Sequence, residues 1–422
     1  MNLKLSLTVF IFLSAHSYAA TPFNGYIVKL KNTDNFLADK SVSKMVNIEK
    51  LTKTSFGNFA KIAAKDGFLE QSLESLKKNP NIEYIEPNYI ITLKKSSFVP
   101  NVPSDTFFEK QWGLKNTGDH DTKLGEDINA TKAWEITKGS KEVKIAVLDS
   151  GIDYNHPDLK NQIEINEAEK NGLPGVDDDN NGYIDDIYGY DFNAKKPDPM
   201  DGNGHGTHCA GVIGAQHDGL GVVGVMANVK LIPVKFLDDK GAGEDIDAVA
   251  AIDYAIKRGA KVMSNSWGSD EKVQALYDAI KAAEKAGIVF VVAAGNDGAD
   301  NDRTPSYPNN FDISNIIAVG ASNNRGNRAS FSNYGSKTVH VFAPGEDIFS
   351  TVNNGEYDWM SGTSMAAPFV SGIVGLLLSK EPNLSPKEIR ERLIRTSVDN
   401  KKLQGDSASN GRVDAYRALM NK

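Results

Sequence analysis

Apolar and polar residues alternate differently in the first and the later parts of the chain, and the change comes near residue 100. Residues 26–30 alternate as a β-strand does, whereas residues 58–78 repeat apolar side chains at the spacing of a helix. Residues 81–91 predict two short strands with a turn at Pro87 between them. A polar, proline-containing stretch at 94–106 follows, and we interpret it as an exposed linker after a small domain.

From Gln111 onward, apolar runs with the length of strands alternate with helical repeats. The predicted strands are residues 143–148, 229–237, 261–267, 288–294, 316–320 and 339–343, and the predicted helices between them are residues 245–258 and 272–286. Alternation of this kind is typical of an α/β fold, in which helices cover both faces of a parallel, doubly wound sheet. Active sites in such folds lie at the carboxyl ends of the strands.

Length and charge narrow the class of protein. A chain of 422 residues can form two or three domains with large cores. The net charge of −8 argues against a nucleic-acid partner. The charge is unevenly spread, because residues 1–100 carry a net charge of +5 and residues 101–422 carry −13. This contrast predicts that the basic first part contacts the acidic remainder.

The first 19 residues have the pattern of a secretory signal peptide (residues 1–19). Lys4 supplies the positive charge, Leu5–Leu13 the apolar run, and Ser17-Tyr18-Ala19 the small residues of a cleavage site after Ala19. The apolar run is too short to span a membrane, and the sequence predicts no membrane span elsewhere. We therefore expect a secreted protein, either extracellular or periplasmic. The single cysteine, Cys209, excludes an intramolecular disulfide.

The stretch around Ser364 is the strongest candidate for chemistry. Residues 361–364 are small and polar, and the residues after Pro368 are mainly apolar, which predicts a tight turn that opens a buried helix. A serine at such a helix start lies beside backbone N–H groups that can bind a developing negative charge. A serine nucleophile also needs a base, and the base needs an orienting acid. Without them, Ser364 would be an ordinary helix N-cap.

Three further stretches supply the missing groups. Asp149 ends the strand at 143–148, and Asn296 follows the strand at 288–294, so both are expected at the carboxyl edge of the sheet. His205 lies between two glycines, which leave its imidazole uncovered. The Asn296 amide is a donor that can bind an oxyanion.

These four stretches resemble the subtilisin-like serine proteases, and the acid, the base and the serine follow the family's order. The resemblance implies that Ser364 is the nucleophile, that His205 is the general base and then acid, and that Asp149 orients the imidazole. It implies an oxyanion hole formed by Asn296 and the Ser364 N–H. It also implies a subtilisin-like catalytic domain over residues 106–422. We expect this domain to cleave protein or peptide substrates through an acyl-enzyme and to be a monomer.

The first domain, residues 20–95, is similar to the inhibitory propeptide of this family. The similarity rests on the strand at 26–30 and on the segment at 81–91. It implies a small α+β, ferredoxin-like domain that assists folding and inhibits the enzyme as its own intramolecular partner. It further implies removal by self-cleavage within residues 91–105, around the linker at 96–105.

Two segments match the strands that bind substrate in the family. They are Gly241-Ala242-Gly243 and Ser266-Trp267-Gly268. Two such edges would hold an extended peptide by strand addition, which depends little on sequence. Trp267 is larger than the residue usual in the family, so the shape of the first specificity pocket is left open.

Residues 177–186 predict a structural, non-catalytic calcium site. The segment alternates oxygen-bearing side chains and has Gly182 at the sixth position, like the start of an EF-hand loop, but it lacks the glutamate of the twelfth position. The predicted ligands are Asp177, Asp179, Asn181, Asp186 and the carbonyl of Tyr183. A solvated acidic turn is the alternative.

A second calcium site is implied by the family resemblance alone. Its predicted ligands are the side chains of Gln111, Asp158 and Asp218 and the carbonyl groups of Gln216, Leu220 and Val222. These residues are scattered along the chain, so they form a site only if the fold gathers them.

Two other interpretations stay open at this point. A metallohydrolase could use His205, His208 and Cys209, although the spacing is not that of HExxH and no glutamate lies between the histidines. The chain could also be an inactive scaffold that keeps the fold and binds without cleaving. Cys209 follows His205 by one helical turn, so its thiol is expected under the imidazole, as a core residue rather than a catalytic one.

Overall fold

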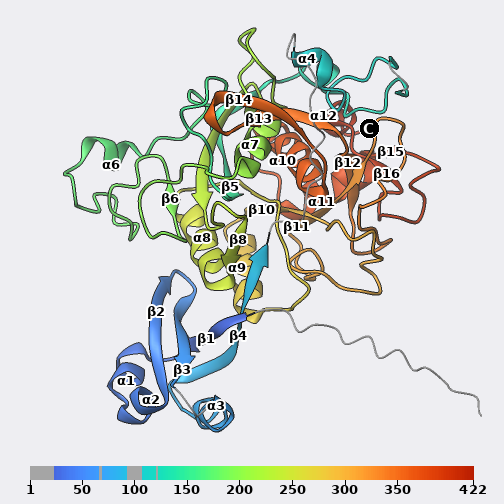
Figure 1. Ribbon diagram of the computed structural model, residues 1–422. Coiled ribbons are helices and arrows are strands. Elements are labelled where there is room, and N and C mark those ends of the chain that lie inside the picture. Colours follow the sequence, from blue (N-terminus) through green and yellow to red (C-terminus); the bar gives the residue numbers. More distant parts are fainter. Residues whose placement is uncertain (1–22, 66–68, 93–106, 120–121) are drawn as a thin grey trace, which may run out of the picture.

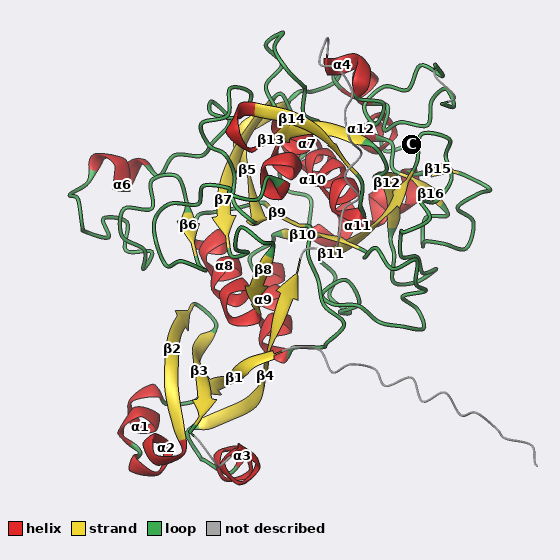
Figure 2. Cartoon of the chain, in the orientation of Figure 1, coloured by secondary structure: helices red, strands yellow, loops and turns green. Residues whose placement is uncertain are grey.

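The computed structural model describes residues 23–65, 69–92, 107–119 and 122–422. Figures 1 and 2 show a small N-terminal domain below a much larger domain, with strand β4 reaching from one to the other. The predicted signal peptide at 1–19 and the predicted linker at 96–105 lie outside the described residues, so both stay predictions.

The N-terminal domain has the α+β, ferredoxin-like topology that we predicted. Its elements in chain order are β1 (Phe23–Leu30), α1 (Thr33–Ala38), α2 (Lys40–Met45), β2 (Val46–Thr54), β3 (Gly57–Ala64), α3 (Leu69–Lys77) and β4 (Ile82–Thr92). The strands form an antiparallel sheet in the order β2-β3-β1-β4. Val28, Phe36, Ile62 and Leu76 belong to a separate small core between this sheet and the helices.

Two details of this domain differ from the predictions. Residues 58–64 form strand β3 instead of a helix, and the helical part of the described residues in this segment is 69–77. The apolar pattern is misleading because β3 is covered on both faces: Phe59 packs against the larger domain, whereas Ile62 faces the small core. Pro87 does not break the chain into two strands, because it lies within the continuous strand β4, beside a register shift in β1.

A nine-stranded sheet forms the centre of the larger domain. Its strands are β5 (Gly139–Asp149), β6 (Tyr190–Asp191), β7 (Asn228–Lys235), β9 (Val262–Asn265), β10 (Val289–Ala293), β11 (Ile316–Ser322), β12 (Val341–Pro344), β15 (Val398–Asp399) and β16 (Gly411–Arg412). They lie in the order β15-β16-β12-β11-β10-β9-β5-β7-β6. Every neighbouring pair is parallel except β15 and β16, so the predicted parallel sheet is confirmed. The strand order reverses at β5, and ligands bind at such points in open α/β sheets.

Helices cover both faces of this sheet, as predicted. One face carries α8 (Asp245–Lys257) and α9 (Gln274–Lys285), and the other carries α7 (His205–Gly214) and α10 (Thr363–Lys380). Side chains of β5 alternate between the two cores, because Ile145 and Val147 lie in the core with α10, and Ala146 and Leu148 lie in the core with α8. This double burial explains why β5 is apolar on both faces.

Helix α10 is buried at the centre of the larger domain. Among the described residues it is the one helix that is long and apolar enough to cross a membrane by length and composition. However, 89% of that segment is buried, and the helix packs against β5, β9, β10, β11 and β12. Its place in the core therefore explains its apolar composition.

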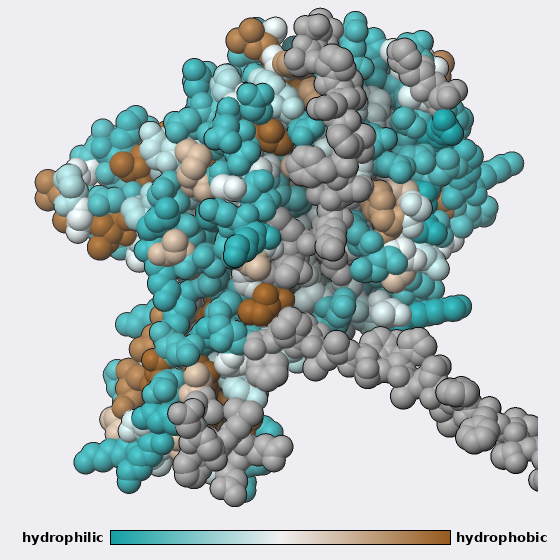
Figure 3. Space-filling view, viewed as in Figure 1, coloured by the Kyte–Doolittle hydropathy of each residue, from teal (hydrophilic) through white to brown (hydrophobic). Residues whose placement is uncertain are grey.

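Shorter elements complete the larger domain. They are α4 (Phe107–Lys110), α5 (Ala130–Ala133), α6 (Glu167–Asn171), β8 (Ala242–Glu244), β13 (Ile348–Val352), the 3-10 turn η1 (Asn353–Gly355), β14 (Glu356–Met360), α11 (Pro386–Thr396) and α12 (Ala415–Met420). The visible surface is mainly hydrophilic, with hydrophobic side chains over the protruding segment that carries α6 (Figure 3). Leu173, which precedes the predicted calcium loop, and Ile184, which lies within it, are exposed.

Strand β4 joins the two domains by pairing with β8. Ile90, Ile91 and Thr92 lie opposite Glu244, Gly243 and Ala242 in an antiparallel register. The larger domain thus adds one strand to the sheet of the N-terminal domain (Figure 1). Since β8 contains two of the residues predicted to bind substrate, β4 occupies the edge that a substrate strand would need.

Candidate active site

Asp149 and His205 form a buried pair at the carboxyl edge of the sheet. Asp149 is the last residue of β5, His205 is the first residue of α7, and their side chains are 1% and 3% exposed. Nδ1 of His205 lies 2.8 Å from Oδ1 of Asp149, which also accepts the backbone N–H of Ser150 at 2.7 Å. Burial alone would lower the pKa of His205, but the charge of Asp149 and its hydrogen bond raise this pKa above the ordinary value.

The close approach of α7 to β5 depends on Gly206. A Cβ atom at this position would lie 2.1 Å from the carbonyl oxygen of Gly151 and 3.1 Å from Cβ of Asp149. A side chain would therefore push the helix away from the strand. The glycine beside His205 thus sets the distance between the imidazole and the carboxylate.

Ser364 lies at the start of α10, as predicted, and is fully buried. Its Oγ donates to the carbonyl oxygen of Ser266 at 3.2 Å, whereas Nε2 of His205 has no hydrogen-bond partner among the described residues. Cys209 connects the three groups: its Sγ lies within 4.8 Å of the polar atoms of Asp149 and His205 and 3.4 Å from the Ser364 carbonyl oxygen. The structure therefore gathers the serine and the Asp149–His205 pair, with the hydroxyl turned toward Ser266.

Asn296 and the backbone of Ser364 present two N–H donors to one small space. Oδ1 of Asn296 accepts hydrogen bonds from both the N–H and the hydroxyl of Thr363 at 2.8 Å, which fixes the amide plane. A Cβ atom on Gly362 would lie 3.4 Å from Nδ2 of Asn296 and 3.5 Å from the Ser364 nitrogen. Both nitrogen atoms therefore lie close to the space over Gly362, which is the candidate position for an oxyanion.

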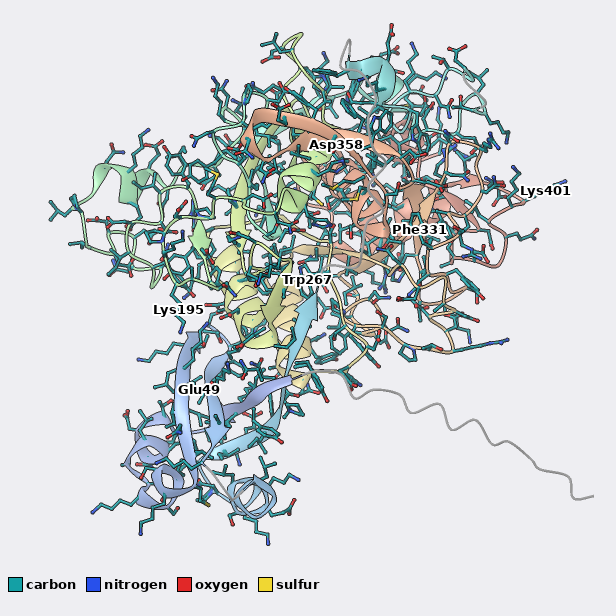
Figure 4. The ribbon with its side chains drawn as sticks, viewed as in Figure 1. Glu49, Lys195, Trp267, Phe331, Asp358 and Lys401 are labelled. Carbon is teal, nitrogen blue, oxygen red and sulfur yellow. The ribbon has the colours of Figure 1, made fainter. Side chains whose placement is uncertain are left out.

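The two predicted substrate segments take different positions. Ala242 and Gly243 lie in β8, and Gly241 directly precedes it, so this segment faces β4. Ser266 contacts the nucleophile region, since its Oγ donates to the Ser364 carbonyl at 2.8 Å. The Trp267 side chain is only 1% exposed and lies inside the larger domain (Figure 4). Its ring packs against Phe236 and Phe290, with centroids 5.0 and 6.4 Å away, so its bulk fills the core.

Comparison with known proteins identifies the family. The model of the subtilase family matches residues 140–413 of this chain. The chain belongs to the subtilase family. The subtilisin-like fold and the prediction of a serine-type endopeptidase are thereby confirmed.

Individual relatives agree with this assignment. The subtilase is 37% identical to a thermophilic serine proteinase of Bacillus sp. (strain AK1), over 84% of this chain and 77% of the relative. It is 35% identical to thermitase of Thermoactinomyces vulgaris, over 75% of this chain and 99% of thermitase. It is 34% identical to subtilisin-like protease 1 of Plasmodium berghei (strain Anka), over 86% of this chain but only 62% of that protein.

A solved structure shows the same architecture. Fervidolysin from Fervidobacterium pennivorans, a keratinolytic enzyme related to subtilisin, superimposes with a TM-score of 0.73 at 27% identity. The match covers 94% of this chain and 61% of that chain. The resemblance thus extends over both domains of this subtilase, although fervidolysin is the longer protein.

The metallohydrolase interpretation is wrong. His208 is fully buried, its Nε2 lies 3.0 Å from the Ile348 carbonyl, and burial lowers its pKa to about 3. His208 does not belong to the cluster of Asp149, His205 and Cys209, and the family and its relatives support a serine-type endopeptidase instead. Cys209 itself is buried, and burial raises the pKa of its thiol well above the ordinary value, which suits a core residue.

The first predicted calcium loop gathers three carboxylates that could hold a cation. Oxygen atoms of Glu169, Asp177 and Asp179 lie within 4.8 Å of one another. Glu169, on α6, was missed by the sequence analysis. Its carboxylate accepts the backbone N–H groups of Asp178, Asp179 and Asp185 at 2.7–3.1 Å and so closes the loop from outside. A cluster of hard oxygen donors fits calcium.

One other predicted ligand, the Asp186 side chain, is engaged elsewhere, whereas the predicted role of the Tyr183 carbonyl stays a prediction. Asp186 is fully buried, and its carboxylate accepts hydrogen bonds from Arg258, at 3.0 Å, and from the Tyr254 hydroxyl on α8. It is part of a buried ion-pair network rather than of the Glu169 cluster. The ring of Tyr183 packs against Tyr254, with centroids 5.1 Å apart. Asn181 stays at the loop, where its amide donates to Asp179 at 3.0 Å and to Asp186 at 3.2 Å.

The second predicted calcium site is gathered by the fold around residues 216–223. Asp158 accepts the N–H of Val222 at 2.9 Å through Oδ2, and its Oδ1 is buried without a partner among the described residues. Asp218 accepts the N–H of Leu220 at 3.0 Å. The Gln111 amide instead exchanges two hydrogen bonds with the backbone of Val223, at 2.8 and 2.9 Å. The unpartnered oxygen of Asp158 is the feature that fits a cation.

Proposed function

We propose that this subtilase is a secreted endopeptidase, made as a self-processing zymogen, in which Asp149, His205 and Ser364 act as a catalytic triad. One observation supports this most strongly. The space over Gly362 lies close to Nδ2 of Asn296, the nitrogen of Ser364 and Cβ of Ser364, and Cys209 lies between this serine and the buried Asp149–His205 pair. A nucleophile, a base with its orienting acid, and two N–H donors are the groups that acyl transfer requires, and their proximity supports the proposal.

The first half of the reaction forms an acyl-enzyme. Ser364 rotates away from Ser266 and donates to Nε2 of His205, which is free to accept this proton. Oγ attacks the scissile carbonyl carbon while Nε2 takes the proton, and Asp149 stabilises the resulting imidazolium. The carbonyl oxygen, now negative, accepts hydrogen bonds from Asn296 and the Ser364 N–H. His205 then protonates the amide nitrogen, the C–N bond breaks, and the amine leaves.

Hydrolysis of the acyl-enzyme repeats these roles with water. His205 removes a proton from a water molecule, and the oxygen attacks the ester carbon. The oxyanion again accepts the two N–H groups. When the bond from carbon to Oγ breaks, His205 returns its proton to Ser364, and the acid product leaves. The enzyme returns to its starting state.

The N-terminal domain is proposed to inhibit the enzyme by covering the substrate edge. Strand β4 uses the backbone groups of Ala242, Gly243 and Glu244 in β8 for antiparallel pairing. An extended substrate that binds by strand addition needs the same groups. The domain must therefore be released, after cleavage in the linker at 96–105, before protein or peptide substrates can bind.

Charged contacts support this pairing of the two domains. Lys29 lies 2.9 Å from Asp278, and Lys61 lies 2.9 Å from Glu244, so basic residues of the N-terminal domain contact acidic residues of the larger one. Glu86 accepts the backbone N–H groups of Gln274 and Ala275 at the start of α9, both at 2.7 Å. A carboxylate at a helix N-terminus is favourable. The contact predicted from the charge contrast is therefore present.

Calcium is proposed to be a structural cofactor of this enzyme. Glu169, Asp177 and Asp179 would hold one ion, and Asp158 and Asp218 would contribute to a second. Such ions would neutralise the repulsion between neighbouring carboxylates and hold surface loops closed. The carboxylates lie outside the triad, so the ions are assigned no role in the reaction. A monomer remains the expected state.

Labelling with a serine-directed fluorophosphonate tests the proposed nucleophile. Peptide mapping of the labelled mature enzyme should place the adduct on Ser364, and His205→Ala and Asp149→Asn should each abolish most labelling and most proteolysis, because the triad acts as one unit. Absence of both labelling and peptide hydrolysis in the mature wild type would instead favour the inactive scaffold.

A further inference from the structure

A second buried carboxylate organises the turn that carries His205. Asp201 is only 3% exposed. Its Oδ1 accepts the backbone N–H groups of Asn203 and Gly204, at 2.8 and 2.9 Å. Its Oδ2 accepts both the N–H and the hydroxyl of Thr207, at 2.9 and 2.7 Å. The single side chain of Asp201 thus binds the backbone on both sides of His205.

Ser150 extends this set of contacts to the strand that carries Asp149. The Ser150 hydroxyl donates to Asp201 at 3.0 Å and accepts the N–H of Gly206 at 3.0 Å. Ser150 directly follows Asp149, so the hydroxyl ties the end of β5 to the first turn of α7. The geometry of the Asp149–His205 pair therefore depends on Asp201 through covalent neighbours of both residues.

The charge of Asp201 also acts on the imidazole. Two carboxylates, Asp149 and Asp201, raise the pKa of His205 against the effect of burial. The other titratable or charged groups near the imidazole are His208 and Cys209 on α7. Lys235 on β7 contacts the Ser150 carbonyl at 2.7 Å. Besides Asp149, which bonds the imidazole itself, Asp201 is the carboxylate that joins the backbone of the His205 turn by hydrogen bonds.

We infer that Asp201 is a positioning residue of the proteolytic reaction, which fixes the His205 turn against Asp149 and adds a second negative charge that favours the imidazolium. The inference rests on the proposed role of His205 as the base. Asp201 touches neither substrate nor the reacting atoms, so it acts through His205 alone. A displacement of the imidazole by an ångström can cost about 100-fold in rate.

The test is the pH dependence of kcat/KM for the mature enzyme, with active sites counted by a serine-directed inhibitor. The acid limb of this profile reports the base of the free enzyme. Asp201→Asn removes the charge and keeps the shape, so the acid limb should move to lower pH and the plateau should fall, by up to about 100-fold. KM should change little, because Asp201 lies outside the substrate edge.

Ser150→Ala separates the two parts of the inference. It removes the link to Gly206 but keeps the Asp201 charge, so the plateau should fall while the acid limb stays at the wild-type pH. Asp127→Asn is the matched control. Asp127 is another buried aspartate, which accepts the N–H groups of Asn116 and Asn129 at 2.7 Å, on a loop that carries no triad residue. Its loss should lower the melting temperature and leave the acid limb unchanged.

Two results would overturn the inference. One is an acid limb of Asp201→Asn at the wild-type pH; the other is a Ser150→Ala enzyme with a wild-type plateau. If Asp201→Asn fails to fold, the Ser150→Ala result decides. A failure of the proposed function would give a different result. In that case His205→Ala would keep its proteolytic activity, whatever the effect of Asp201→Asn.

Discussion

The hydroxyl of Ser364 donates to the carbonyl oxygen of Ser266 at 3.2 Å, and this contact takes the place of a hydrogen bond to His205. The serine and its proposed base are therefore close but not yet bonded. A hydrogen bond between them requires the Ser364 hydroxyl to leave Ser266, and catalytic hydrogen bonds commonly tighten only when substrate is bound. The two nitrogen atoms of the proposed oxyanion hole, in contrast, already lie 3.4 and 3.5 Å from the position of a Cβ on Gly362.

Filling the oxyanion space should remove activity without unfolding the enzyme. Gly362 has an extended backbone, with φ of 165°, and a Cβ there would make only ordinary contacts at 3.4–3.7 Å. Gly362→Ala should therefore fold normally and lose on the order of 100-fold in kcat, similar to the loss of one oxyanion donor. Asn296→Ala should lose about 100- to 1,000-fold.

Kinetics and melting temperature together check this prediction. The kcat should fall in both variants while the melting temperature of Gly362→Ala stays near that of wild type. A fully active Gly362→Ala enzyme would show that the transition state does not use the space over Gly362.

The thiol of Cys209 should be dispensable. Its Sγ is 3.6 Å from the Ser266 hydroxyl, and it makes no bond to a reacting atom. Cys209→Ala should therefore keep proteolysis. A mercurial should slow the wild type by bulk beside His205 and should not affect Cys209→Ala. Loss of activity in the alanine variant, measured with a peptide substrate, would assign the thiol a chemical role.

The candidate site could largely be predicted from the sequence because its groups are attached to elements that the hydrophobic pattern reveals. Asp149 ends an apolar strand, Asn296 follows another, and Ser364 opens an apolar helix. Parallel strands bring their carboxyl ends to one edge, so these residues meet. The same reasoning failed for residues 58–64, because a strand buried on both faces has no alternation to recognise.

Residues that act through backbone groups were not predictable. Asp201 and Glu169 each bind several N–H groups of a loop, and nothing in the residue type indicates which loop will fold around a carboxylate. Asp186 was assigned to the calcium loop by spacing alone, but the structure pairs it with Arg258, which lies 72 positions further along the chain. Contacts over such separations depend on the tertiary fold.

Release of the N-terminal domain should depend on pH through Asp245. This residue at the start of α8 is fully buried, and no side chain among the described residues donates a hydrogen bond to its carboxyl group. Burial raises its pKa well above the ordinary value, the charges of Glu86 and Glu244 add to this, and only the backbone N–H of Tyr89 opposes it. The complex of the two domains therefore favours the protonated form of the Asp245 carboxyl group.

The sign of the effect follows from this raised pKa. Once the domain leaves, Asp245 is expected to be exposed and to recover a pKa of about 3.9. The N-terminal domain then binds the enzyme most tightly below that pKa. Its affinity falls by up to about tenfold for each unit of pH above it, and becomes constant above the raised pKa of Asp245 in the complex. The inhibition constant of the separate 20–95 fragment, measured from about pH 5 upward, should rise with pH.

Two variants identify the group responsible. Asp245→Asn should remove the pH dependence of inhibition. Asp253→Asn is the matched control, because Asp253 also binds the N-terminal domain, through the Ser55 N–H at 2.9 Å. Asp253→Asn should weaken inhibition at every pH and leave the dependence of the inhibition constant on pH unchanged. A fragment that fails to inhibit at micromolar concentration would contradict the inhibitory role of the domain itself.

Calcium should stabilise the folded enzyme. An ion that binds only the folded form adds about 3 to 4 kcal/mol when it is present at several hundred times its dissociation constant. A chelator should therefore lower the melting temperature. The measurement uses the Ser364→Ala protein, so that self-digestion cannot contribute.

Single variants assign the calcium effect to its loop. Glu169→Gln and Asp179→Asn should lower the melting temperature and blunt the response to added calcium. Asp178→Asn is the matched control, because this carboxylate caps the N–H of Leu173 at 2.9 Å and stays outside the cluster. It should keep the response. A melting temperature that does not change with chelator would leave residues 177–186 as a solvated acidic turn.

The most direct test of the account is intact mass spectrometry of the purified wild type and the Ser364→Ala variant. The central claim is that Ser364 is the nucleophile, both for substrates and for removal of the N-terminal domain. The wild type should have the mass of a chain that begins within or near residues 96–105, and it should hydrolyse casein. Ser364→Ala should have the mass of the chain from Ala20 to Lys422 and no activity. A Ser364→Ala protein that is processed like the wild type and still hydrolyses casein would contradict the assignment of the nucleophile.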